Sequence, residues 1–247
     1  MKMKNFVEGL AVVLVVSQAT ACVIYDDTEP VEAASITARW SFHNIATDKT
    51  TACPAGFDTV ALNNQELDVD GRPIGQPYID LFDCADGSGI SAPLAPSVYQ
   101  TWISVTNTDG TQTYADSLSA IVDVIDTDKT FTASILNDGG YFQLSWDLVG
   151  ATSNQPLACS DVPGLASIES IGTSIASPDI AAADKFTCGD HAGVTGGFLQ
   201  GAYTVSITAL DRNDRALSEP VNLANQKIAA RNRVTDLGHV EIPITGR

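Results

Sequence analysis

The sequence predicts an all-β protein built of two tandem β-sandwich modules. Three observations support this prediction. Short segments alternate between apolar and polar residues, landmarks of the first half recur in the second half, and each half holds two cysteines at matching places. Alternation with a period of two puts every second side chain on the same face, which is typical of a strand with one buried side. No long segment of the sequence has the apolar spacing of a helix.

An internal repeat divides the body of the chain into two copies. Four landmarks recur in the same order, two at a spacing of 106 residues and two at a spacing of 104, so a deletion of two residues separates the copies. The pairs are Trp40 with Trp146, Cys53 with Cys159, Cys84 with Cys188, and Tyr99 with Tyr203. This order predicts two tandem copies of one structural module.

The first strand of each copy shows the alternation most clearly. One face is apolar in both copies, through Ile36, Ala38, Trp40 and Phe42 in the first and Phe142, Leu144, Trp146 and Leu148 in the second. The other face is polar. We therefore predict that Trp40 and Trp146 are core residues.

Further alternating stretches supply the remaining strands. The expected strands cover residues 99–106, 120–125 and 131–135 in the first copy, and 203–210, 221–228 and 240–244 in the second. Turn-rich segments at 107–110 and 211–214 predict hairpins. Six or seven strands in a copy of this length are typical of a β-sandwich, and an up-and-down barrel over both copies is the main alternative.

One short motif resembles a known family. The stretch Gly201-Ala202-Tyr203-Thr204-Val205-Ser206-Ile207 resembles the G-x-Y-x-V-x-V signature of prealbumin-like and other Ig-like bacterial surface modules, and in the first copy Ser97 replaces the glycine. The resemblance implies a β-sandwich fold and no particular function.

The N-terminus reads as a secretory signal peptide. Lys2 and Lys4 precede a short apolar run at residues 10–16, which is shorter than the roughly 20 residues of a membrane-spanning helix. The following Ala19-Thr20-Ala21-Cys22 resembles the processing site of bacterial lipoproteins, although alanine replaces the usual leucine and Glu8 precedes the apolar run. The resemblance implies that Cys22 is lipidated, becomes the first residue of the mature chain and anchors it in the bacterial cell envelope.

Two details refine this expectation. Val23 replaces the aspartate that retains such lipoproteins in the inner membrane, so the resemblance implies the outer membrane. The alternative is an ordinary signal peptide that is cut after Ala21 and leaves Cys22 as a free thiol. The expected organisation is a signal peptide at 1–21, an acidic tether at 22–35, and modules at 36–138 and 139–247.

The four remaining cysteines are expected to form disulfides, because an exported protein resides in an oxidising compartment. Of the three possible connectivities, only Cys53 with Cys84 and Cys159 with Cys188 respects the duplication.

The composition limits the kinds of molecule that the protein is expected to bind. The chain has 13 Lys and Arg against 30 Asp and Glu, a formal charge of −17, which is the wrong sign for binding nucleic acid phosphates. We expect contact with a membrane only through the N-terminal lipid. The expected partner is another envelope protein or a surface polymer.

No catalytic motif is found, and we predict a non-catalytic protein without a cofactor. The histidines His43, His191 and His239 stand in no motif that places a base against a nucleophile. Carboxylates are too abundant for any pair to be informative, so a hydrolase stays a third hypothesis. Cys188 and His191 are three residues apart, but Gly87 replaces the histidine in the first copy, which favours a surface histidine over a zinc ligand. Acidic turns at 68–71, 107–110 and 126–128 leave calcium binding open.

The leading hypothesis is therefore a tethered protein that binds an envelope component or acts as a structural spacer. The alternative is a protein that binds carbohydrate or a small ligand through Trp102, an aromatic platform without a tryptophan counterpart in the second copy. Trp102 lies on the Tyr99 strand, however, and packing inside the sandwich or across the strand is the simpler explanation of its presence.

Overall fold

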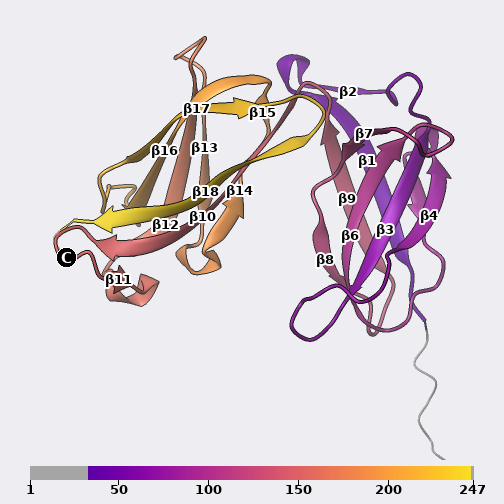
Figure 1. The fold of residues 1–247 in the computed structure, drawn as a ribbon, viewed down its shortest axis with the longest axis horizontal. Coiled ribbons are helices and arrows are strands. Elements are labelled where there is room, and N and C mark those ends of the chain that lie inside the picture. Colours follow the sequence, from indigo (N-terminus) through magenta and orange to yellow (C-terminus); the bar gives the residue numbers. More distant parts are fainter. Residues whose placement is uncertain (1–32, 246–247) are drawn as a thin grey trace, which may run out of the picture. The chain divides into compact units, whose positions relative to one another are not determined.

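The computed structural model describes residues 33–245 of the chain (Figure 1). The expected signal peptide, the lipidation site Cys22 and most of the expected tether lie outside the described residues. Within residues 33–245, no helix combines the length and the apolar character needed to cross a membrane.

The first module contains nine strands in two sheets. They are β1 (Ile36–Asn44), β2 (Lys49–Thr51), β3 (Thr59–Leu67), β4 (Tyr78–Asp83), β5 (Ser88–Ile90), β6 (Val98–Thr106), β7 (Thr113–Asp116), β8 (Ala120–Asp123) and β9 (Lys129–Leu136). In one sheet β1 pairs with β9 in parallel and with β2 and β5 in antiparallel orientation. The other sheet has the order β4-β3-β6-β7, and β8 also pairs with β6. Short 3₁₀ turns follow β1 and β4, at Ile45–Thr47 and Cys84–Asp86.

The second module repeats this plan. Its strands are β10 (Gly139–Gly150), β11 (Pro156–Leu157), β12 (Leu165–Ser174), β13 (Ala181–Phe186), β14 (Ala192–Val194), β15 (Phe198–Leu199), β16 (Gly201–Asp211), β17 (Val221–Ile228) and β18 (Arg233–Ile244). Here β10 pairs in parallel with β18, as β1 does with β9, and the second sheet has the order β13-β12-β16-β17. The 3₁₀ turns Cys159–Asp161 and Cys188–Asp190 contain the two cysteines.

The sheets and cores confirm the predicted fold class of two tandem β-sandwiches. Each of the four sheets draws its strands from one copy of the repeat. One buried cluster gathers apolar residues between Ala34 and Ile135, and another gathers those between Phe142 and Ile244. A single barrel over both copies is therefore wrong.

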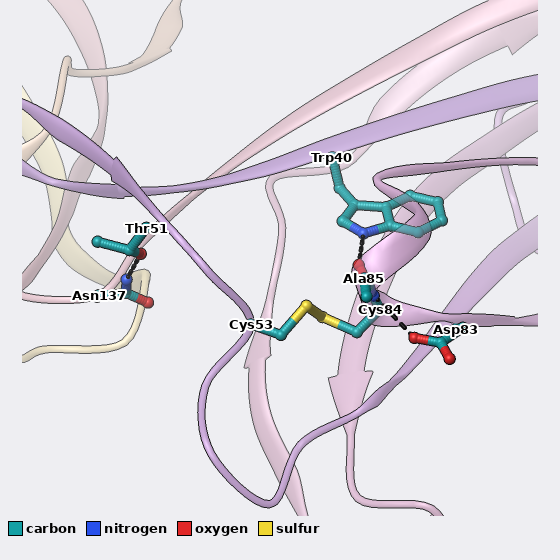
Figure 2. Close-up of a disulfide and its surroundings, with 7 residues drawn as sticks. All are labelled: Trp40, Thr51, Cys53, Asp83, Cys84, Ala85 and Asn137. Carbon is teal, nitrogen blue, oxygen red and sulfur yellow. Dashed lines mark hydrogen bonds between the residues drawn. A yellow bond between two sulfur atoms is a disulfide. The ribbon is translucent and has the colours of Figure 1, made fainter.

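A tryptophan, a phenylalanine and a disulfide form the same unit in both modules. The indole N–H of Trp40 donates to the carbonyl oxygen of Cys84 at 2.8 Å, beside the Cys53–Cys84 disulfide (Figure 2). The indole N–H of Trp146 donates to the carbonyl oxygen of Cys188 at 3.2 Å, and Cys188 is bonded to Cys159. A ring packs beside each indole, Phe82 in the first module and Phe186 in the second. The disulfide connectivity is the one that the duplication predicts.

The chain between the two cores is tied to the first module. Asp138 accepts hydrogen bonds from the backbone N–H groups of Ile45 and Ala46, at 2.8 and 3.0 Å. The side-chain amide of Asn137 donates to the hydroxyl of Thr51 at 2.6 Å (Figure 2). The two bonds to Asp138 satisfy backbone donors at the start of the first 3₁₀ turn, which would otherwise lack partners.

Two strands differ from the sequence prediction. β3 was not expected, because Asn63-Asn64-Gln65 in its middle is a polar sequence, yet all three side chains are buried. The side-chain oxygen of Asn64 accepts from the hydroxyl of Thr101 at 3.0 Å. β18 begins at Arg233 rather than at residue 240, and its pairing with β10 shifts register between Gln143 and Ser145.

Candidate functional site

Trp102 lies in the middle of β6, on the outer face of the sheet. Along β6 the side chains of Tyr99, Thr101, Ile103 and Val105 are buried, whereas those of Gln100, Trp102 and Ser104 are partly exposed. Since alternate residues of a strand face opposite sides, Trp102 points away from the core that Tyr99 enters. Of the two kinds of packing expected for Trp102, packing inside the sandwich is therefore wrong, whereas its position opposite Asn63 on the outer face agrees with packing across the strand.

Three rows of side chains cross this outer face. Residues directly opposite each other on antiparallel strands are neighbours on the same face. The rows are Ile79, Asn63 and Trp102; Leu81, Ala61, Ser104 and Asp116; and Gln65, Gln100 and Ile121. The indole of Trp102 thus lies among amides, hydroxyls and a carboxylate, with apolar residues at the margins.

Hydrogen bonds fix the polar groups next to Trp102. The amide nitrogen of Asn63 donates to the hydroxyl of Ser104 at 3.2 Å, and that hydroxyl donates to the carboxylate of Asp116 at 2.6 Å. The amide nitrogen of Gln100 donates to the hydroxyl of Ser119 at 3.0 Å. This network holds the side chains in place before any ligand arrives, which reduces the entropy lost on binding.

An aromatic ring, an apolar side chain and several polar groups lie close together here, namely Trp102, Leu118, Gln100, Asp116, Ser117 and Ser119. Such a combination is typical of a ligand site. We refer to Trp102, Asn63, Gln100, Ser104 and Asp116 as the Trp102 face.

The second module lacks this arrangement. At the position of Trp102 stands Ser206 on β16, and its cross-strand neighbour on β12 is Ile171 in place of Asn63. The outer residues of β16 are Thr204, Ser206 and Thr208, none of which offers a flat apolar surface. The Trp102 face is therefore specific to the first module.

A second polar cluster lies on the outer face of the other module. The carboxylate of Asp147 is 3.5 Å from Nδ1 of His191 and 3.5 Å from Nε2 of His239. Nδ1 of His239 is also 3.2 Å from the hydroxyl of Ser145. At 3.5 Å the contacts with Asp147 are electrostatic rather than hydrogen bonds, and all three charged or titratable side chains are exposed. From the sequence the histidines are expected to be separate, because only the parallel pairing of β10 with β18 brings Asp147 and His239 together.

The remaining candidate sites show local contacts. Asp68 and Asp109 accept hydrogen bonds from the turns that contain them, and the Thr111 hydroxyl lowers the pKa of Asp109. Such self-bonded aspartates are typical of hairpin turns. Within residues 33–245, no group of three or more His, Cys, Asp or Glu side chains is arranged to hold a metal ion.

Comparisons with known proteins give no family for this chain. No protein-family model and no curated protein matches it. Among solved structures, it is similar to a leucine-rich repeat protein from Bacteroides thetaiotaomicron, with 8% identity, a TM-score of 0.36 and coverage of 87% of this chain. The chain spans 27% of the length of that protein.

Two further similar structures are matched over most of their own length. They are GBS52, the minor pilin of Streptococcus agalactiae, and the fimbrial anchor protein Mfa2 of Porphyromonas gingivalis. The identity is 12% in both cases, with TM-scores of 0.32 and 0.29. The alignment covers 87% of this chain and 98% of the pilin, and 78% of this chain and 83% of the anchor protein. At these identities and TM-scores the likenesses establish neither the family nor the function of this chain.

Proposed function

We propose that this protein is a non-catalytic cell-envelope protein that binds a carbohydrate-containing surface polymer on the Trp102 face. The observation that supports the proposal is a partly exposed indole on the outer face of a sheet, surrounded by amide, hydroxyl and carboxylate groups that are already held by hydrogen bonds. Nothing in the packing of the core requires a tryptophan at this position.

The chemistry of this face matches that of a sugar ring. A sugar presents C–H groups on its flat side and hydroxyls around its edge. The indole of Trp102 can cover the C–H side, while the second amide N–H of Gln100 donates and the carboxylate of Asp116 accepts. Because Asp116 lies in the face and the chain has a charge of −17, a neutral glycan fits better than an anionic one.

A test uses the chain from Val23 onward, which contains all the residues that the structure describes. We expect this protein to bind neutral glycans on an array, and Trp102→Ala to weaken the binding by at least about tenfold, since aromatic anchors dominate such contacts. Trp102→Phe should retain part of the affinity because a flat ring remains. Affinity is measured by calorimetric titration with the glycan that gives the strongest signal.

The second module supplies a matched control. Ser206→Ala changes the position equivalent to Trp102 and should leave glycan affinity unchanged. Absence of binding to any glycan, or equal binding by the wild type and Trp102→Ala, would contradict the proposal. In the first case the structural spacer hypothesis would be favoured.

The location in the envelope is part of the proposal and depends on the N-terminal sequence. Two disulfides suit an exported protein. We expect Cys22→Ser to stop the incorporation of labelled palmitate and to move the protein from the outer-membrane fraction to the soluble fraction, because the acyl chains supply the membrane affinity. Wild-type protein in the soluble fraction, without label, would instead indicate ordinary cleavage after Ala21.

A further inference from the structure

One edge of the first module lacks the protection that exposed strand edges normally have. β4 is the terminal strand of its sheet and pairs only with β3. Its sequence, Tyr-Ile-Asp-Leu-Phe-Asp, contains neither lysine nor proline. The exposed fractions are 51% for Tyr78, 56% for Ile79 and 67% for Leu81. A free, apolar edge offers unpaired backbone groups and side chains to another strand, and proteins usually blunt such edges with lysine or proline.

The duplication shows what a protected version of this edge looks like. In β13, the matching terminal strand, Ala182, Ala183 and Lys185 replace Tyr78, Ile79 and Leu81. The ammonium group of Lys185 donates to Asp214 at 2.6 Å and lies 3.9 Å from Glu169. The hydrogen bond to Asp214 raises the pKa of Lys185, which keeps the charge on this edge. The two copies of one module therefore differ at the same edge.

A hollow at the end of β4 places two carboxylates beside this apolar edge. It has a volume of about 300 Å³ and is lined by Asp58, Thr59, Leu81, Phe82, Asp83 and Thr108. Asp58 accepts from the hydroxyl of Thr108, and Asp83 accepts from the backbone N–H of Ala85. Within residues 33–245, no lysine or arginine forms an ion pair with either carboxylate. In the second module, Lys185 supplies a cation at the matching position.

We propose that the free edge of β4 binds an extended strand of another protein by β-strand addition. Apolar side chains at alternate positions of that strand lie over Ile79 and Leu81, and a lysine or arginine at one end enters the hollow between Asp58 and Asp83. Charge complementarity selects this partner over a second copy of the chain. Two β4 strands would bring together the aspartates Asp80 and Asp83 of molecules that each carry a charge of −17. Ile79 and Leu81 lie on the same outer face as Trp102, but the Trp102 face includes neither of them, so either proposal can fail without the other.

Two synthetic peptides test the proposal on the chain from Val23 onward. One is acetyl-Lys-Val-Thr-Val-Thr-Val-Thr-amide, and the other has glutamate in place of the lysine. We expect fluorescence anisotropy to show binding of the lysine peptide, at least about tenfold tighter than that of the glutamate peptide. Hydrogen exchange should slow at the amides of β4 when the lysine peptide is bound, and not at those of β13.

A variant that carries the pattern of β13 provides the structural control. Ile79→Ala with Leu81→Lys should weaken binding of the lysine peptide by at least about tenfold, while Ala183→Ser on the edge of β13 should have no effect. Both variants change exposed side chains, and an unchanged unfolding midpoint verifies that they fold. Equal binding of the two peptides, or binding that survives the double substitution, would overturn the proposal. Sedimentation could also overturn it. If the wild-type protein is a dimer and the double substitution makes it a monomer, the strand bound at the edge of β4 is that of a second copy of this chain.

Discussion

Replacing Trp146 by alanine is expected to lower the free energy of unfolding by about 3–5 kcal/mol. The side chain is fully buried, packs 5.5 Å from the ring of Phe186, and donates its indole N–H to the carbonyl oxygen of Cys188. Alanine leaves a cavity and removes the donor for that oxygen. Urea denaturation of the chain from Val23 onward measures the change.

Two further substitutions separate the contributions to this loss. Trp146→Phe keeps a ring in the core and removes the N–H donor, so its cost should be about 1–3 kcal/mol. Trp102→Ala should cost less than about 1 kcal/mol, because Trp102 is partly exposed on the outer face. If Trp102→Ala destabilised the protein as much as Trp146→Ala does, Trp102 would have a structural role and its assignment to a binding face would be wrong.

Removing either disulfide is expected to lower the free energy of unfolding by about 3–4 kcal/mol. The cysteines are separated by 31 residues in the first module and 29 in the second, so the two bridges close loops of nearly equal length in the unfolded chain. Cys53→Ala with Cys84→Ala, and Cys159→Ala with Cys188→Ala, should therefore have similar effects. The midpoint and slope of urea denaturation measure both.

Chemical reduction offers a control without mutation. A thiol reductant opens both bridges of the wild-type protein, so the loss of stability should be about the sum of the losses in the two double variants. An effect below about 1 kcal/mol for both would show that the bridges stabilise little beyond the packing of the core.

The fold could be predicted because its signals are local or duplicated. A strand is expected at residues 221–228, and β17 has these bounds, although its alternation is interrupted at Ala224 and Asn225, both of which are exposed. The cysteine pairing followed from the repeat, since only one connectivity treats both copies alike. Trp40 and Trp146 occupy the same position in both cores, as the alternation of the first strand predicts.

The differences arise where tertiary contacts override the local pattern. Partners in other segments stabilise the amides of β3 in the interior: the side-chain oxygen of Asn64 accepts from Thr101, and Gln65 donates to the carbonyl oxygen of Ile74. The buried amide nitrogen of Asn64 has no hydrogen-bond partner among the described residues. β18 extends across Gly238, whose φ of 78° favours glycine, because β10 provides a long parallel partner. A local pattern contains neither of these contacts.

The candidate site was predictable only in part. The spacing of Tyr99 and Trp102 puts them on opposite faces of one strand, which identifies the indole as the outer residue once Tyr99 is placed in the core. Its neighbours could not be found in this way, because Asn63 and Asp116 reach Trp102 through the pairing of β6 with β3 and β7. The cluster around Asp147 could not be predicted either, because it also depends on strand pairing. The contrast between β4 and β13 requires knowing which strands are the edges of the sheets.

The central claim is that the Trp102 face binds a neutral glycan, and the indole N–H resonances of the three tryptophans test it most directly. Trp40 and Trp146 are buried and bonded to the carbonyl oxygens of Cys84 and Cys188. In an isotope-labelled sample titrated with the glycan, the account predicts that the resonance of Trp102 shifts and the other two stay in place. Binding of the glycan with an unchanged Trp102 resonance would contradict it.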